Sequence, residues 1–166
     1  TYAANCKAWQ RRIDEALFGP DLVEEAGGAK LARLAEAGEL DAWLAENELA
    51  DRLGGWLKAL APAKGRGVVA FHTNMNYFWK RFGIELAATV EPKPGIPPSA
   101  GHVADVILLV REKKIPAVFT QPYYDDSAVK LIAGKPGAKT VVVDIEAVDA
   151  LATIETVVRE IAKAVQ

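Results

Sequence analysis

The chain is poor in the residues that build most metal clusters and nucleophilic sites. Its 166 residues include one cysteine, Cys6, and two histidines, His72 and His102. A single cysteine excludes an intramolecular disulfide and any multi-cysteine metal cluster. Cys6 lies on the apolar stripe of an amphipathic pattern over residues 2–18, so we expect it to be buried as a packing residue. Metal chemistry here would have to use histidine and carboxylate side chains.

The chain also lacks an excess of basic charge and a long apolar run. Its 20 lysines and arginines and 22 aspartates and glutamates leave a formal charge of -2. Because the basic residues are spread along the chain, no nucleic-acid-binding surface is indicated. No apolar stretch reaches the roughly 18 residues that span a bilayer. The chain starts at Thr1 without a basic and apolar leader, so we expect any secretion signal to have been removed or never included.

The pattern of apolar residues changes near residue 62, from helical spacing before it to alternating strand and helix patterns after it. Spacings of three and four between apolar residues predict a helix over residues 2–18, which Gly19-Pro20 ends. Because that helix starts without an N-cap signal, we expect it to continue a longer helix. The Ala-, Leu- and Glu-rich segments 21–26, 29–37, 40–47 and 50–61 indicate short helices. The glycines between them are typical of helix-ending turns and complete no phosphate-binding motif. We expect residues 1–61 to form a linker helix with a helical lead-in.

From residue 67 onward, predicted strands alternate with predicted helices. The strands are 67–72, 84–90, 116–121 and 139–143, and the helices are 74–82, 99–113, 126–134 and 150–165. Alternation of this kind is typical of parallel sheets covered by helices. We therefore predict an α/β second domain over residues 62–166, with a mostly parallel four-stranded sheet flanked by helices.

Two of the predicted strands end in side chains that bind metals. The apolar run 68–71 is followed by His72, and the last strand is followed by Asp144. Open α/β sheets bind ligands beyond the carboxyl ends of their strands, and imidazole and carboxylate are common ligands of transition metals. Together these positions indicate part of a metal site. From position alone, His72 could instead cap a helix and Asp144 could be a loop or N-cap residue, while His102 fits a surface position in a first helical turn.

Further polar residues follow the other two strands. Glu91 ends the second strand, and Gln121, Tyr123, Tyr124, Asp125 and Asp126 follow the third. These residues are candidates to support a ligand or to gate the site. Asp125 or Asp126 could equally cap the helix that follows.

An enzyme that uses the same rim is the main alternative. Asp144 or Glu91 could act as an acid or base on a doubly wound sheet. However, Ser99 and Ser127 lie outside any GxSxG sequence, and no HExxH helix is present. The residues therefore offer little support for a nucleophilic triad or a metalloprotease.

Four blocks of the sequence, in order, resemble the carboxyl-terminal half of the zinc- and manganese-binding solute-binding proteins of ABC importers. They are residues 72–83, residues 90–99, residues 117–122 and residues 137–144. The resemblance covers almost all of residues 62–166. The first helix is similar to the helix that links the two lobes of that family, and residues 19–61 resemble the helical lead-in of one branch less closely.

The resemblance implies a role for His72 and Asp144 as the third and fourth metal ligands, with two more expected from an amino-terminal lobe that this chain does not include. It also implies a carrier without bond chemistry, in the periplasm or elsewhere outside the cytoplasm, that passes Zn²⁺, or alternatively Mn²⁺, to an ABC transporter permease. Two protein ligands bind zinc much more weakly than a complete site. A truncated lobe without metal binding is therefore a second alternative.

Overall fold

The computed structural model describes residues 1–135, 137–146 and 148–165. The chain forms two compact units, Thr1–Ala61 and Pro62–Gln166. Within the described ranges, no helix combines the length and hydropathy that a bilayer crossing requires.

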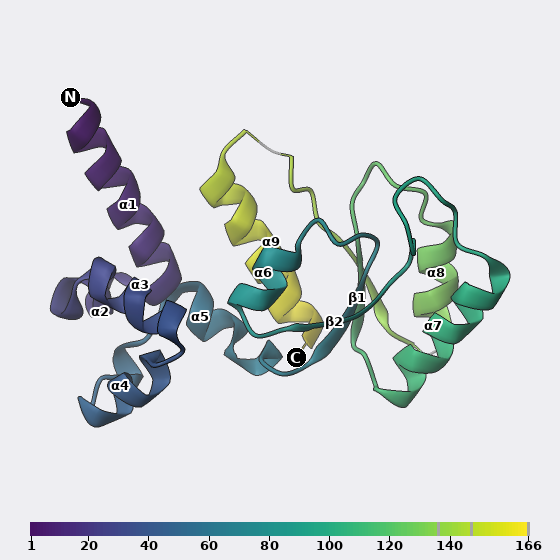
Figure 1. Ribbon diagram of the computed structural model, residues 1–166, viewed down its shortest axis with the longest axis horizontal. Coiled ribbons are helices and arrows are strands. Elements are labelled where there is room, and N and C mark those ends of the chain that lie inside the picture. The colour runs from purple at the N-terminus through teal and green to yellow at the C-terminus, as the bar shows by residue number, and fades with distance from the viewer. Residues whose placement is uncertain (136, 147, 166) are drawn as a thin grey trace. The chain divides into compact units, whose positions relative to one another are not determined.

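The first unit is helical. Its elements are α1 (Tyr2–Phe18), α2 (Pro20–Ala26), α3 (Gly28–Ala37), α4 (Leu40–Glu46), the 3₁₀ turn η1 (Ala50–Arg52) and α5 (Gly55–Leu60). Figure 1 shows α2, α3 and α5 beside the carboxyl-terminal part of α1. The core holds Phe18, Leu22, Val23, Leu31, Leu40 and Leu44. It therefore leaves the start of α1 outside.

The prediction that Cys6 is buried is wrong. Cys6 is exposed, as are Tyr2, at 90%, and Trp9, at 43%. The spacing of apolar residues correctly marks a stripe along α1, but burial also requires a partner surface. Within the described part of this unit, the partners of α1 pack only on its later turns.

The prediction of one helix over residues 50–61 also needs correction. The segment divides into η1 and α5, and Gly54 precedes α5 instead of ending a helix. The backbone N–H of Gly54 donates to the Phe18 carbonyl at 2.7 Å, and Gly55 has a φ of 58°. A Cβ on Gly55 would overlap the Ala16 carbonyl. The two glycines therefore allow α5 to pass against the end of α1, which interrupts the helix.

The second unit confirms the predicted α/β class. After the 3₁₀ turn η2 (Ala61–Ala63), its strands are β1 (Gly67–Ala70), β2 (Glu85–Thr89), β3 (Ala117–Thr120) and β4 (Lys139–Val142). They form one sheet in the order β2-β1-β3-β4 with parallel pairs throughout. The helices are α6 (Asn76–Arg81), α7 (Ala100–Glu112), α8 (Ser127–Gly134) and α9 (Ala150–Val165). The strands are one or two residues shorter than predicted.

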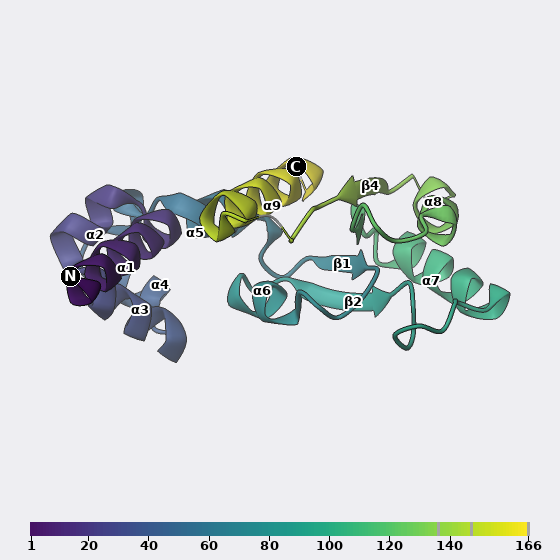
Figure 2. The same ribbon diagram turned by 90° about the horizontal axis from the view of Figure 1, so that it is seen from above.

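Helices cover both faces of this sheet. Val69 and Val118 pack with α7 and α8 on one face, while Phe119 meets Trp79 of α6 on the other, with 5.2 Å between ring centroids. Figures 1 and 2 show α6 and α9 on the face opposite α7 and α8. β3 is buried at all four positions, and three of its residues, Ala117, Val118 and Phe119, are apolar, as is typical of strands covered on both faces. Because all four strands run parallel, their carboxyl ends lie at the same edge of the sheet, which we call the carboxyl edge.

Candidate metal site

The side chains of His72 and Glu91 meet directly at the carboxyl edge. The β1–β2 pairing extends beyond the strands, because the N–H groups of Val90 and Glu91 donate to the carbonyls of Ala70 and Phe71 at 2.9 and 3.1 Å. This pairing sets His72 and Glu91 side by side. Nε2 of His72 lies 2.7 Å from Oε2 of Glu91, with the side chains only 15% and 11% exposed. The contact is therefore a short, partly desolvated imidazole–carboxylate pair.

Aromatic rings hold the imidazole in place. Tyr124 stacks on Phe71 with 4.3 Å between centroids and meets the His72 ring edge-on at 5.0 Å. Phe71 also packs edge-on against His72 at 5.1 Å. On the carboxylate side, the N–H of Gly95 donates to Oε2 of Glu91 at 3.3 Å. The imidazole is thus confined by rings, whereas a single backbone group and His72 hold the carboxylate.

Asp144 lies at the same edge, on the other side of β3. The ladder again continues past the strands, since the Val143 N–H donates to the Thr120 carbonyl at 2.9 Å. With β3 between β1 and β4, the two chain ends are separated by two strand spacings, about 10 Å at the backbone. Oδ1 of Asp144 accepts the N–H of Glu146 at 3.0 Å. The other oxygen, Oδ2, is not used in that turn.

The described residues contain no group of three or more histidine, cysteine, aspartate or glutamate side chains that could hold a metal ion. The structure thus brings His72 and Glu91 into contact and leaves Asp144 separate from them at the same edge. Any metal bound here needs donors beyond the His72–Glu91 pair.

Carboxylates give the carboxyl edge a negative character. Burial raises the pKa of Tyr124, and the charges of Glu146 and Glu91 raise it further. The pKa of Tyr123 is raised by burial first, then by Glu146 and, more weakly, by Asp144. The same field that opposes a tyrosinate favours a cation. Glu146 was not singled out from the sequence, although its place two residues after Asp144 was an available signal.

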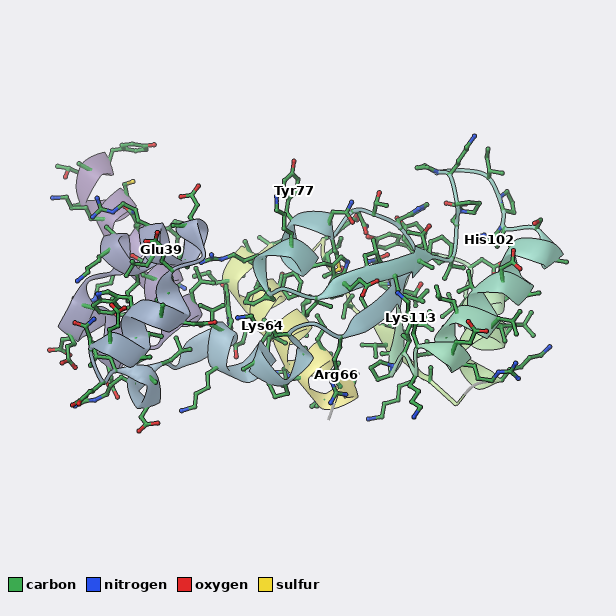
Figure 3. The ribbon with its side chains drawn as sticks, turned by 60° about the horizontal axis from the view of Figure 1, so that its bottom comes forward. Glu39, Lys64, Arg66, Tyr77, His102 and Lys113 are labelled. Atoms are coloured by element: carbon green, nitrogen blue, oxygen red, sulfur yellow. The ribbon has the colours of Figure 1, made fainter. Side chains whose placement is uncertain are left out.

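His102 and the two serines have structural roles instead. Nε2 of His102 makes a 2.9 Å hydrogen bond with the Thr89 carbonyl at the end of β2, and its backbone N–H donates to Oγ of Ser99 at 3.2 Å. Ser99 is therefore the N-cap of α7, where Figure 3 places His102. The Ser127 N–H donates to Oδ1 of Asp125 at 2.8 Å. The pKa of Asp125 is lowered by a hydrogen bond with the Ser127 side chain and then by this backbone hydrogen bond. Both serines therefore make hydrogen bonds at the starts of helices.

Gln121 is buried at the end of β3, beneath the edge. Its Nε2 lies 4.0 Å from the sulfur of Met75, which is a weak contact. Within the described part of the chain, its Oε1 has no hydrogen-bond partner. Gln121 is thus a buried residue next to the carboxyl edge, and its one side-chain contact described above is with Met75.

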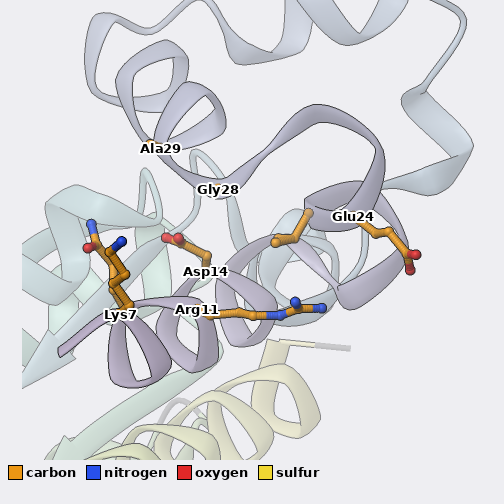
Figure 4. Close-up of a pocket in the computed structure, with 8 residues that line it drawn as sticks. Lys7, Arg11, Asp14, Glu24, Gly28 and Ala29 are labelled. Carbon is orange, nitrogen blue, oxygen red and sulfur yellow. The ribbon is translucent and has the colours of Figure 1, made fainter. Parts of the chain in front are cut away.

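A second hollow lies in the helical unit, between α1 and the start of α3. Figure 4 shows it, with Lys7, Arg11 and Asp14 of α1 and Glu24 of α2 among the side chains that line it. It encloses about 430 Å³. Neither histidine lines it, and its two carboxylates, Asp14 and Glu24, are matched by two basic side chains, so it has no excess of negative charge to attract a cation. The carboxyl edge is therefore the better candidate for a metal site.

The helix-covered parallel sheet thus carries an imidazole and carboxylates, side chains of the types that bind metals, at its carboxyl edge. Residues 39–164 match the family model described as ZnuA, zinc-uptake complex component A, periplasmic. This match spans well over half of the chain, so the chain belongs to the ZnuA family. The recognition made from the four sequence blocks is confirmed.

Individual relatives share about a quarter of their aligned residues with this chain. The high-affinity zinc uptake system protein ZnuA of Brucella abortus (strain 2308) is 27% identical over 85 residues, which are 51% of this chain and 25% of that protein. The chain thus spans about a quarter of the length of this curated relative.

Solved structures support the fold. A crystal structure of ZnuA has a TM-score of 0.60 at 24% identity, covering 84% of this chain and 55% of that one. The solute-binding protein FpvC from Pseudomonas aeruginosa, solved in complex with Mn²⁺, has a TM-score of 0.56 at 22% identity, covering 84% of this chain and 59% of that one. At these identities the likeness establishes the architecture.

Proposed function

We propose that this chain binds a divalent transition metal through His72 and Asp144 as part of a solute-binding protein of an ABC importer. The observation that carries the proposal is an imidazole and a carboxylate at one acidic sheet edge, in a member of a zinc-uptake family. Zn²⁺ is the proposed cargo and Mn²⁺ the alternative, because imidazole favours zinc and additional oxygen donors favour manganese.

The rest of the role follows from the family. Its members are binding components of uptake systems, not catalysts, so the proposal includes no bond chemistry. The proposed partner is an ABC transporter permease, and the proposed site of action is the periplasm, which the word periplasmic in the family description supports. Zinc prefers four ligands. An amino-terminal lobe would supply the missing donors, and this chain on its own would bind with lower affinity.

Calorimetric titration of this chain with zinc tests the site. His72→Ala and Asp144→Ala should each weaken binding by about tenfold or more, because each removes a direct donor. His102→Gln and Asp126→Asn are the matched controls. His102 is bonded to a backbone carbonyl, and Asp126 pairs with Lys130 at 2.8 Å in an exposed ion pair. The controls should bind like the parent chain. Unchanged affinity in both test variants would contradict the proposed site.

A further inference from the structure

We propose that Glu91 is a direct metal ligand and that it binds the cation together with His72. This inference rests on the proposed function and adds a donor to it. The sequence alone ranked Glu91 only as a supporting or gating residue. Its contact with Nε2 of His72 is what changes that assignment.

The distance between the two donor atoms suits a shared metal. Zinc bonds of about 2.0–2.2 Å at a tetrahedral angle place neighbouring donor atoms about 3.4 Å apart. Nε2 of His72 and Oε2 of Glu91 are 2.7 Å apart. They therefore need to separate by only about 0.7 Å to admit the ion.

Glu91 is the partner with room to move. Its side chain lines a cavity of about 520 Å³ that is also bounded by Pro97, Val103 and Leu131. Only the 3.3 Å hydrogen bond from Gly95 holds the same oxygen from that side. His72, by contrast, is confined by the rings of Phe71 and Tyr124. Entry of a metal would therefore displace the carboxylate toward the cavity while the imidazole stays in place.

A ligand role also has consequences for metal preference. Glu91 and Asp144 would give this lobe two carboxylate donors for its one imidazole. Oxygen donors suit manganese better than further imidazoles do. Losing the Glu91 carboxylate should therefore reduce manganese binding at least as much as zinc binding.

The competing explanation is that Glu91 only orients His72. Glutamine separates the two roles, because its amide oxygen can still accept hydrogen bonds from His72 and Gly95 but carries no charge. Loss of an orienting residue can also weaken binding tenfold or more, but it leaves the set of donor atoms on the metal unchanged. Loss of a ligand changes that set.

The experiment is calorimetric titration of the chain and its variants with zinc, paired with the visible absorption spectrum of the Co²⁺-loaded protein. Glu91→Gln should weaken zinc binding about tenfold or more and should change the Co²⁺ bands that report the ligand set. Glu85→Gln is the matched control, since it removes the same charge at the opposite end of β2, where Glu85 pairs with Lys113 at 2.8 Å. Circular dichroism of each variant checks the fold.

The outcomes separate the two proposals. If His72→Ala weakens binding and Glu91→Gln leaves the Co²⁺ spectrum unchanged, the ligand role of Glu91 is overturned, whatever the change in affinity, and the proposed function stands. Tighter binding by Glu91→Gln would also overturn it, because Glu91 would then be a competitor for His72. If the parent chain binds no zinc at millimolar concentration, both proposals fail.

Discussion

Asp14 shows how a single carboxylate depends on its neighbours. Its side chain lies against Gly28 in the first turn of α3, and a Cβ on that glycine would overlap the carboxylate. Burial raises the pKa of Asp14. Desolvation of the charged form is the cause of this shift, so the burial of Asp14 brings a stability cost. A carboxylate is therefore part of the packing between α1 and α3 in the helical unit, whereas carboxylates belong to the candidate metal site in the α/β unit.

This cost predicts a pH-dependent effect of Asp14→Asn. A pKa raised on folding means that the folded state prefers the protonated carboxyl. The charged form lowers stability above the folded pKa, and the cost disappears as the pH falls below the ordinary value of 3.8. Asp14→Asn should thus raise the melting temperature at pH 7 and lose that advantage in acid. Thermal melts followed by circular dichroism, with exposed Asp51→Asn as the control, measure it. An equal gain at both pH values would contradict burial of charge as the cause.

At the scale of elements, the alternation of periodicities was enough to predict the strands and helices of the second unit. Hydrophobic spacing is a local property, so it marks β1 and α7 without any knowledge of their neighbours. The predictions failed where a contact between elements decides the outcome. The break between η1 and α5 arises from the close approach to α1, with the Gly19 and Gly54 backbones so near that a Cβ on Gly19 would lie 2.8 Å from the Gly54 Cα.

That contact predicts different costs for two glycine substitutions. Gly38 and Gly55 both have positive φ, at 76° and 58°, but only Gly55 faces the α1 backbone. Gly38→Ala should cost about 1 kcal/mol from the backbone conformation alone. Gly55→Ala should cost at least about 2 kcal/mol more, because the helices have to separate. Urea unfolding followed by circular dichroism gives both values. Equal costs would show that α5 can move away from α1 freely.

At the scale of the whole molecule, the two units have different tasks in the proposed function. The proposed metal ligands, His72, Glu91 and Asp144, all lie in the α/β unit. The helical unit carries the exposed stripe of α1. In the α/β unit, Tyr77 is 91% exposed, and Figure 3 shows its side chain projecting from α6. Metal binding should accordingly act on one unit only.

Zinc should slow hydrogen exchange in the α/β unit and leave the helical unit unchanged. A ligand that binds only the folded form stabilises it by about 2.7 kcal/mol at one hundred times its Kd. Exchange read by mass spectrometry resolves the units, because peptides from residues 1–61 and 62–165 are distinct. His72→Ala should abolish the effect. Equal slowing in both units would instead indicate a coupled unfolding reaction.

The amino-acid sequence by itself determined which segments form strands and which polar residues end them, because both depend on neighbours along the chain. His72, Glu91 and Asp144 could be identified as strand-end residues in this way. Only the tertiary structure decided the strand order, which long-range packing of helices on the sheet establishes. Since β2 lies beside β1 and β3 separates β1 from β4, Glu91 touches the imidazole while Asp144 stands across the sheet edge.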